Sequence, residues 1–140
     1  MDMPASIGPF SVTRRRILLV EDDAAVRRSL QLLLAGAGYE VRSYASSRGL
    51  ADDPEALRAD CLVADLVIPE GDGLMLLEEL HAGGWSGKAI LISGYLTRER
   101  AAQAREIGFD ALFEKPLLES SLTACVERLL APPGRPDEAG

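Results

Sequence analysis

Polar side chains follow four of the short apolar runs in this 140-residue sequence. The residues at these places are Glu21, Asp22, Asp23, Asp65, Ser93, Glu114 and Lys115. Carboxylates held close together repel one another, and a divalent cation with oxygen ligands relieves that repulsion. A lysine and a hydroxyl beside such a cation suit the oxygens of a phosphoryl group. If the four places meet in space, they describe a phosphoryl-transfer site in which an aspartate is the acceptor.

Each of these residues also has a simpler explanation. Acidic residues after a strand often cap the next helix, and for Glu21–Asp23 alone this is an equal alternative. A turn before Gly94 explains Ser93, and ordinary surface exposure explains Lys115. Asp65 is harder to dismiss, because it ends the apolar run CLVAD and an unpaired buried carboxylate is unfavourable. The phosphoryl-transfer interpretation prevails because four separate strand ends each supply a residue type that it needs.

Apolar runs alternate with amphipathic segments, and this alternation sets the expected architecture. The runs are Ile17–Val20, Tyr39–Tyr44, Cys61–Ala64, Ala89–Ile92 and Ala111–Phe113. Apolar stripes at helical spacing predict helices around residues 26–37, 74–80 and 118–129, with weaker helices at Ser46–Leu57 and Thr97–Ile107. The alternation predicts a doubly wound α/β fold with a parallel sheet and helices on both faces. Ligands bind such sheets beyond the carboxyl ends of the strands, where the polar residues lie.

Length and composition indicate one folded domain, since 47% of the residues are hydrophobic and 26% are charged. We expect a loose arm over residues 1–13, a folded unit over 14–130 and a disordered tail over 131–140. The net charge of −7 argues against direct nucleic-acid binding, and no apolar run is long enough to span a membrane. Cys61 and Cys125 lack metal or disulfide spacing and no secretory signal is apparent, so we expect a cytoplasmic protein.

The sequence resembles the receiver domains of two-component response regulators across the whole folded unit. The segment RILLVEDDAAVRRSLQLLL resembles the family's first strand, acid pair and first helix, and CLVADLVIPEGDGL resembles its phosphoacceptor strand and following loop. AILISG resembles the strand that ends in a hydroxyl residue, and GFDALFEKPL resembles the lysine–proline end. One such segment is weak evidence, whereas four in this order and spacing are specific. The resemblance implies a flavodoxin-like fold with a five-stranded parallel sheet, order 2-1-3-4-5, and five helices.

The resemblance also implies a metal site. Glu21 and Asp22 match the acid pair that binds Mg²⁺ in the family. Asp65 matches the aspartate that accepts phosphate from a phosphohistidine and also contacts the metal. Val67 matches the position that gives its backbone carbonyl to the metal, a role that tolerates any side chain. Asp23 lies one step beyond the acid pair, and we expect it to cap the first helix.

The remaining matches concern the phosphoryl group and the conformational switch. Ser93 matches the switch hydroxyl, and Lys115 matches the lysine that contacts the phosphoryl group. The peptide bond from Lys115 to Pro116 is typically cis in the family. The sequence departs from the family at Leu112, where many receivers carry an aromatic ring that swings inward on activation. Phe113 is the next residue, but adjacent strand residues point to opposite faces, so we do not expect it to replace that ring.

These matches imply a signalling domain and not an enzyme, with its own phosphorylation and dephosphorylation as its only chemistry. The expected partners are a sensor histidine kinase or histidine phosphotransfer protein and an output partner of unknown identity, and a phosphorylation-dependent homodimer stays open. One alternative is a receiver cut from a longer regulator or hybrid kinase. A remote alternative is a Mg²⁺-dependent phosphatase of the haloacid-dehalogenase type, although Val67 stands where its DxD motif needs a second aspartate.

Overall fold

Five parallel strands form a sheet that brings the predicted site residues to one edge. The computed structural model describes residues 14–131. The strands are β1 (Arg16–Val20), β2 (Glu40–Tyr44), β3 (Cys61–Asp65), β6 (Lys88–Ser93) and β7 (Ala111–Glu114). Their order is β2-β1-β3-β6-β7, and each neighbouring pair is parallel. The predicted order 2-1-3-4-5 is confirmed.

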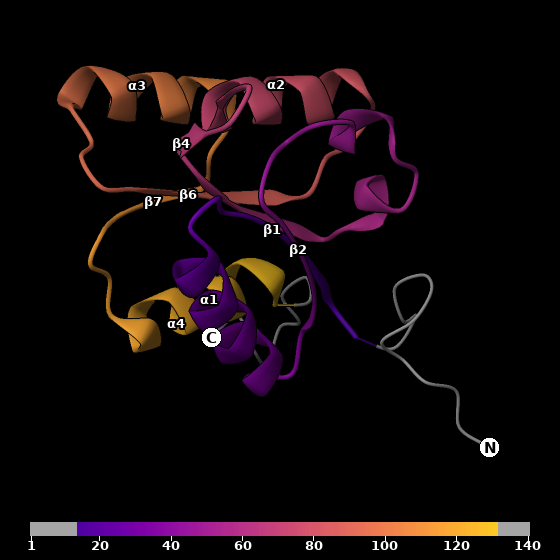
Figure 1. Ribbon diagram of the computed structural model, residues 1–140, viewed down its shortest axis with the longest axis vertical. Helices are drawn as coiled ribbons and strands as arrows, with labels where there is room; N and C mark the ends of the chain where they lie inside the picture. The colour runs from indigo at the N-terminus through magenta and orange to yellow at the C-terminus, as the bar shows by residue number, and fades with distance from the viewer. Residues whose placement is uncertain (1–13, 132–140) are drawn as a thin grey trace, which may run out of the picture.

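Helices cover both faces of this sheet (Figure 1). Helices α1 (Ala24–Gly36) and α4 (Glu119–Leu130) lie on one face, and α2 (Gly73–Ala82) and α3 (Arg98–Ile107) lie on the other. No helix in residues 14–131 has the length and apolar character of a membrane span. The predicted arm over residues 1–13 lies outside the described residues, as does the predicted tail beyond residue 131.

Side-chain caps begin three of the helices. Asp23 accepts hydrogen bonds from two first-turn amides of α1, and Asp72 and Thr97 each accept one at the starts of α2 and α3. These caps satisfy backbone amides that have no partner inside the helix. Asp23 and Thr97 each lie in the loop that follows a strand, so their caps fix where these two loops end and the helices begin. The predicted capping role of Asp23 is confirmed.

The helix predicted over Ser46–Leu57 is wrong. That segment instead contains two short 3₁₀ turns, η1 (Leu50–Asp52) and η2 (Ala56–Arg58). Pro54 cannot donate a backbone hydrogen bond, and it forces Asp53 before it into an extended conformation, with φ −94° and ψ 111°. A continuous helix is therefore interrupted in its middle. The described residues contain four α-helices, and the expected number of five is corrected accordingly.

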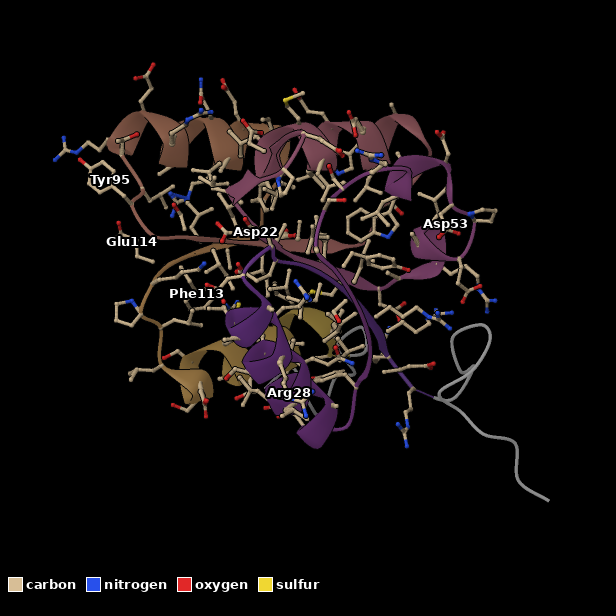
Figure 2. The ribbon with its side chains drawn as sticks, viewed as in Figure 1. Asp22, Arg28, Asp53, Tyr95, Phe113 and Glu114 are labelled. Carbon is tan, nitrogen blue, oxygen red and sulfur yellow. The ribbon has the colours of Figure 1, made fainter. Side chains whose placement is uncertain are left out.

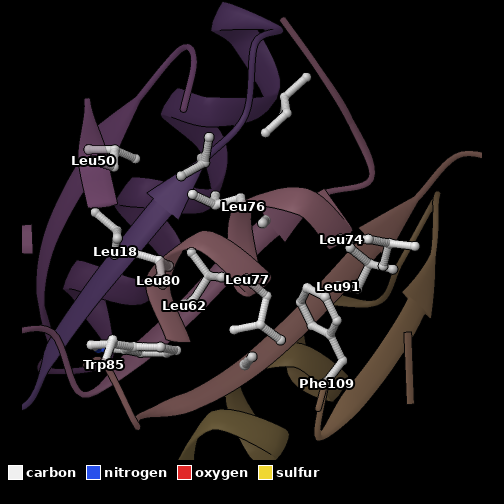
Figure 3. Close-up of a cluster of buried hydrophobic side chains, with 14 of the residues drawn as sticks. Leu18, Leu50, Leu62, Leu74, Leu76, Leu77, Leu80, Trp85, Leu91 and Phe109 are labelled. Carbon is white, nitrogen blue, oxygen red and sulfur yellow. The ribbon is translucent and has the colours of Figure 1, made fainter. Parts of the chain in front are cut away.

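The sheet separates two clusters of buried side chains, one under each pair of helices. Alternation along β1 places Leu18 in the cluster under α2 and α3, and Ile17 in the cluster under α1 and α4. Figure 3 shows the first cluster, in which side chains of α2 pack on Leu62 and Leu91 of the sheet. Leu50 of η1 also belongs to it, so the segment without a helix still covers the core. Strands buried on both faces account for the uninterrupted apolar runs.

A small hairpin connects the end of β3 to α2. Its strands are β4 (Val67–Ile68) and β5 (Gly71–Asp72), which pair antiparallel. The amide of Gly73, the first residue of α2, donates a 2.8 Å hydrogen bond to the carbonyl of Leu66. This contact brings the start of α2 directly against the end of β3.

The contact at Gly73 generates a stability prediction. A Cβ at this position would lie 2.6 Å from the carbonyl oxygen of Asp65 and 2.9 Å from Cδ1 of Leu91. The first neighbour is backbone, so the strand end or the helix has to shift. We expect Gly73→Ala to lower the free energy of unfolding by about 1–3 kcal/mol, as overpacking does.

Gly36→Ala is the matched control, because a Cβ on Gly36 would meet open space. We expect it to leave the free energy of unfolding unchanged or to raise it by about 0.5–1 kcal/mol. Denaturant titrations measure both variants. Equal stabilities of the two variants would contradict the close packing at Gly73.

Candidate functional site

The carboxyl ends of four strands meet at one edge of the sheet and bring the predicted residues together. Glu21 and Asp22 follow β1, Asp65 ends β3, Ser93 ends β6, and Lys115 follows β7. Figure 2 labels Asp22 and Glu114 at this edge, between the two helix layers. The order of the strands places β1 and β3 side by side at the centre of the sheet. Residues far apart in the sequence thereby form one cluster.

Lys115 is the cation of this cluster. Its Nζ donates hydrogen bonds to Oδ2 of Asp65 at 2.6 Å and to Oε1 of Glu21 at 3.1 Å. Glu21 is 1% exposed and Asp65 is 7% exposed, so both carboxylates lie almost fully out of water. A buried charge without a partner is strongly unfavourable. Lys115 therefore holds together two carboxylates that would otherwise repel each other.

Three carboxylates form a compact oxygen-rich group. One oxygen from each of Glu21, Asp22 and Asp65 lies within 4.8 Å of the others. Asp22 is exposed, whereas the other two are buried, so the group opens to solvent on the side of Asp22. Carboxylate oxygens are the ligands that Mg²⁺ prefers, and the donor set fits such a hard cation.

The loop that carries the acid pair is fixed on several sides. Oε2 of Glu21 accepts the amide of Asp23 at 3.0 Å, and the amide of Glu21 donates to the carbonyl of Tyr44 at 3.0 Å. Nη1 of Arg27 donates to the carbonyl oxygen of Glu21 at 2.8 Å. The helical pattern of the sequence places Arg27 on the polar face of α1, so its contact with the loop was not predicted. Both carboxylate oxygens of Glu21 are thus already engaged.

Burial and pairing shift the pKa values of the central groups in this site. Burial raises the pKa of Glu21, and this effect outweighs the hydrogen bonds from Asp23 and Lys115, which lower it. Partial burial on its own would lower the pKa of Lys115, but hydrogen bonds to Asp65 and Glu21 outweigh it and raise that pKa. The lysine therefore keeps its positive charge at neutral pH.

The backbone beyond Asp65 turns back toward its side chain. The amide of Val67 donates to Oδ1 of Asp65 at 3.1 Å, so the backbone of Val67 borders the acidic group. The amide of Leu66 pairs with the carbonyl of Ile92 in β6 at 2.8 Å. The Val67 side chain is 70% exposed and makes part of the rim of the site.

The hydroxyl of Ser93 is engaged within its own loop. It donates to the carbonyl of Tyr95 at 2.9 Å and accepts from the amide of Tyr95 at 3.2 Å. Among the described residues, no hydrogen bond joins Ser93 to Asp65. Ser93 is buried, whereas Tyr95 is 76% exposed. A residue of the predicted site therefore lies at the correct strand end but points its hydroxyl toward the loop.

The last strand fixes the remaining residues of the site. Leu112 packs against the core cluster under α2 and α3, and Phe113 packs against the cluster under α1 and α4. Phe113 is therefore on the wrong face to replace an aromatic at position 112. The Lys115 amide donates to the carbonyl of Ser93 at 2.8 Å. The expected cis peptide bond between Lys115 and Pro116 is present.

Comparisons with known proteins agree with this geometry. Residues 17–127 match the family described as the response regulator receiver domain. The chain is 31% identical over 129 residues to the transcriptional regulatory protein FixJ of Bradyrhizobium diazoefficiens, covering 91% of this chain and 63% of FixJ. It is 37% identical over 119 residues to the sensor kinase CckA of Brucella abortus, covering 81% of this chain and 12% of CckA.

A solved structure gives the same result for the fold. The crystal structure of a CheY-like receiver domain protein from Methanospirillum hungatei JF-1 superposes with a TM-score of 0.74 at 27% identity, covering 83% of this chain and 93% of that one. The chain spans less than two thirds of the length of the FixJ proteins that it matches. Fold, strand-end residues and sequence match together show that the chain belongs to the response regulator receiver family.

Proposed function

We propose that this domain accepts a phosphoryl group on Asp65 from the phosphohistidine of a sensor histidine kinase or a histidine phosphotransfer protein. The assignment to Asp65 depends on one observation. Oδ2 of Asp65 accepts a 2.6 Å hydrogen bond from Lys115, and Asp65 belongs to the group of three carboxylates. In the transfer, an oxygen of Asp65 bonds to phosphorus, the P–N bond breaks, and its electron pair returns to the imidazole. Lys115 is placed to contact an oxygen of the transferred group.

The same proposal assigns a Mg²⁺ site to Glu21, Asp22, Asp65 and the backbone carbonyl of Val67. A divalent cation held there would offset the negative charge on the phosphoryl oxygens. Asp22 is the exposed residue of the three carboxylates, and its side chain is shorter than that of Glu21, so it is suited to direct contact with the ion. Glu21 already uses both oxygens on Asp23 and Lys115, and this favours contact through water.

Phosphorylation of Asp65 is proposed to act through Ser93. The hydroxyl would leave Tyr95 and turn to a phosphoryl oxygen, and the loop before α3 would follow. This movement would change the surface at α3, and an output partner would bind the changed surface. Phosphorylation-dependent pairing of two copies remains a prediction. We place these events in the cytoplasm, because Cys61 and Cys125 are buried free thiols, typical of a reducing compartment.

The effect of phosphorylation depends on whether this domain acts alone or as part of a longer protein. FixJ continues beyond the matched segment, and in CckA the match covers 12% of a sensor kinase. Both arrangements place a receiver inside a longer protein, as in the alternative of a receiver taken from a larger regulator or hybrid kinase. The phosphoacceptor chemistry proposed for Asp65 is the same in either arrangement. In the stand-alone case, the domain would act by binding a partner or by passing phosphate on.

The acceptor assignment predicts that Asp65→Asn abolishes labelling by acetyl phosphate or a phosphorylated histidine kinase. The amide cannot form the acyl phosphate, and the change is nearly isosteric, so the fold should persist. The measurement is incorporation of acid-labile phosphate. Asp72→Asn is the matched control, because asparagine still caps α2 and labelling should be retained. Acid-labile phosphate on the Asp65→Asn protein would exclude Asp65 as the acceptor.

The metal assignment predicts that Asp22→Ala weakens Mg²⁺ binding more than Glu21→Ala does. We expect a loss of at least about tenfold for Asp22→Ala, or about 1.4 kcal/mol. Calorimetric or NMR titration measures the affinities. Asp23→Ser is the control, since it removes a charge from the same loop but keeps the cap on α1. An unchanged Mg²⁺ affinity in Asp22→Ala would refute the assignment.

The rim of the site predicts slow loss of the phosphoryl group. Val67 and Tyr95 lie two residues beyond the acceptor and the switch hydroxyl, and neither side chain is a strong base that could orient an attacking water. We expect Val67→Asn combined with Tyr95→Glu to speed self-dephosphorylation at least about tenfold, or about 1.4 kcal/mol in the barrier. Decay of the labelled protein measures the rate. Leu32→Asn, which changes an exposed apolar residue of α1, should leave it unchanged; decay no faster in the double variant would mean that these positions do not control water access.

A further inference from the structure

Three hydrogen bonds between side chains and backbone groups hold the loop of residues 94–97 between β6 and α3. Two of them join the hydroxyl of Ser93 to the backbone of Tyr95. The third is made by Glu114, whose Oε2 accepts the amide of Leu96 at 2.9 Å. Figure 2 shows Glu114 and Tyr95 next to each other at the same end of the sheet. The loop is therefore fixed both from its own strand and from the neighbouring strand.

The position of Glu114 follows from the register of the sheet. Ser93 and Glu114 are partners across the parallel pair of β6 and β7. Side chains alternate along a strand, and Leu112 points to the layer of α2 and α3, so Glu114 projects toward the same layer. The loop before α3 begins on that side. A glutamate at the last position of β7 thus reaches the Leu96 amide across the strand end.

We propose that Glu114 is a positioning residue that holds this loop in the conformation in which Ser93 bonds to Tyr95 and not to Asp65. The inference rests on the proposed function of Asp65 and adds a residue that has no contact with the phosphoryl group. Ser93 must release the Tyr95 backbone before its hydroxyl can reach a phosphoryl oxygen on Asp65. Because Leu96 is the next residue, the same movement breaks the hydrogen bond from the Leu96 amide to Glu114.

The packing around Leu96 supports this role. Its side chain is partly buried against the cluster under α2 and α3, which Leu112 also contacts. Leu96 is therefore fixed by its side chain in the core and by its amide on Glu114. At position 112 the aliphatic side chain provides no ring to move with the loop. A polar contact from Glu114, two residues further along β7, links that strand to the loop instead.

A contact made only in the resting conformation reduces the apparent affinity for anything that binds the other conformation. Removal of a single exposed, charge-assisted hydrogen bond should change that affinity by about threefold to tenfold. Glu114→Ala should therefore bind beryllofluoride, a mimic of the phosphoryl group, about threefold to tenfold more tightly than the original protein in the presence of Mg²⁺. The measurement is a titration followed by NMR or calorimetry.

Two further variants separate the hydrogen bond from the charge. Glu114→Gln loses the charge but keeps an acceptor oxygen for the Leu96 amide, so its beryllofluoride affinity should stay close to that of the original protein. Glu78→Ala removes the same charge from an exposed position of α2 and should also leave the affinity unchanged. Amide exchange without ligand gives an independent readout. The Leu96 amide should exchange faster in Glu114→Ala and at the original rate in Glu114→Gln.

Each outcome has a distinct meaning. If the original protein binds no beryllofluoride, the proposed function fails, and the role of Glu114 fails with it. If the original protein binds it and Glu114→Ala binds with equal affinity, the role of Glu114 alone is refuted. If Glu114→Gln binds as tightly as Glu114→Ala, the effect comes from charge, and the positioning role is likewise refuted. Unchanged exchange of the Leu96 amide in Glu114→Ala would also contradict the proposal.

Discussion

The contact of Lys115 with two buried carboxylates is the constraint on which the rest of this domain depends. Glu21 and Asp65 come from neighbouring strands, and their negative charges lie almost fully out of water. Such a pair persists only where a cation offsets it, because an unpaired buried charge destabilises the fold. Lys115, delivered by β7 from the edge of the sheet, provides that charge. The strand order, the strand ends and the loop after β7 all serve to keep these three side chains together.

The two core clusters hold the carboxyl-end edge of the sheet in place, although their side chains do not belong to the site. The side chains of β3 are buried on both faces, so Asp65 extends from a strand that has little freedom to move. The start of α2 packs against the carbonyl of the same residue through Gly73. By contrast, the loop of residues 94–97 is held by hydrogen bonds to Ser93 and Glu114 and by the partly buried side chain of Leu96. The proposed acceptor therefore lies on a strand that is buried on both faces, and the loop that is proposed to respond follows the end of β6.

Much of this arrangement could be predicted from the sequence, because burial leaves periodic patterns. Apolar runs predicted the five strands, and the residue types that follow them predicted that Asp65 and Lys115 lie at one edge of the sheet. The helix expected over Ser46–Leu57 was wrong, because Pro54 interrupts the segment and only two 3₁₀ turns form around it. The contacts of Arg27 and Glu114 were missed for another reason. Each contact joins a charged side chain to a backbone group. Every residue has a carbonyl and nearly every residue has an amide, so the residue type does not indicate which backbone group a side chain will bond.

Within residues 14–131, the sheet also divides the interior into two layers that share no buried side chains. Leu18 belongs to the cluster under α2 and α3, which also includes Leu50 of η1, whereas Ile17 belongs to the cluster under α1 and α4. Substitutions that lie far apart and share no partners tend to act additively on stability. One layer can therefore accumulate changes during evolution while the packing of the other stays intact. In such a domain, the surface formed by α2 and α3 can diverge while the packing under α1 and α4 is kept.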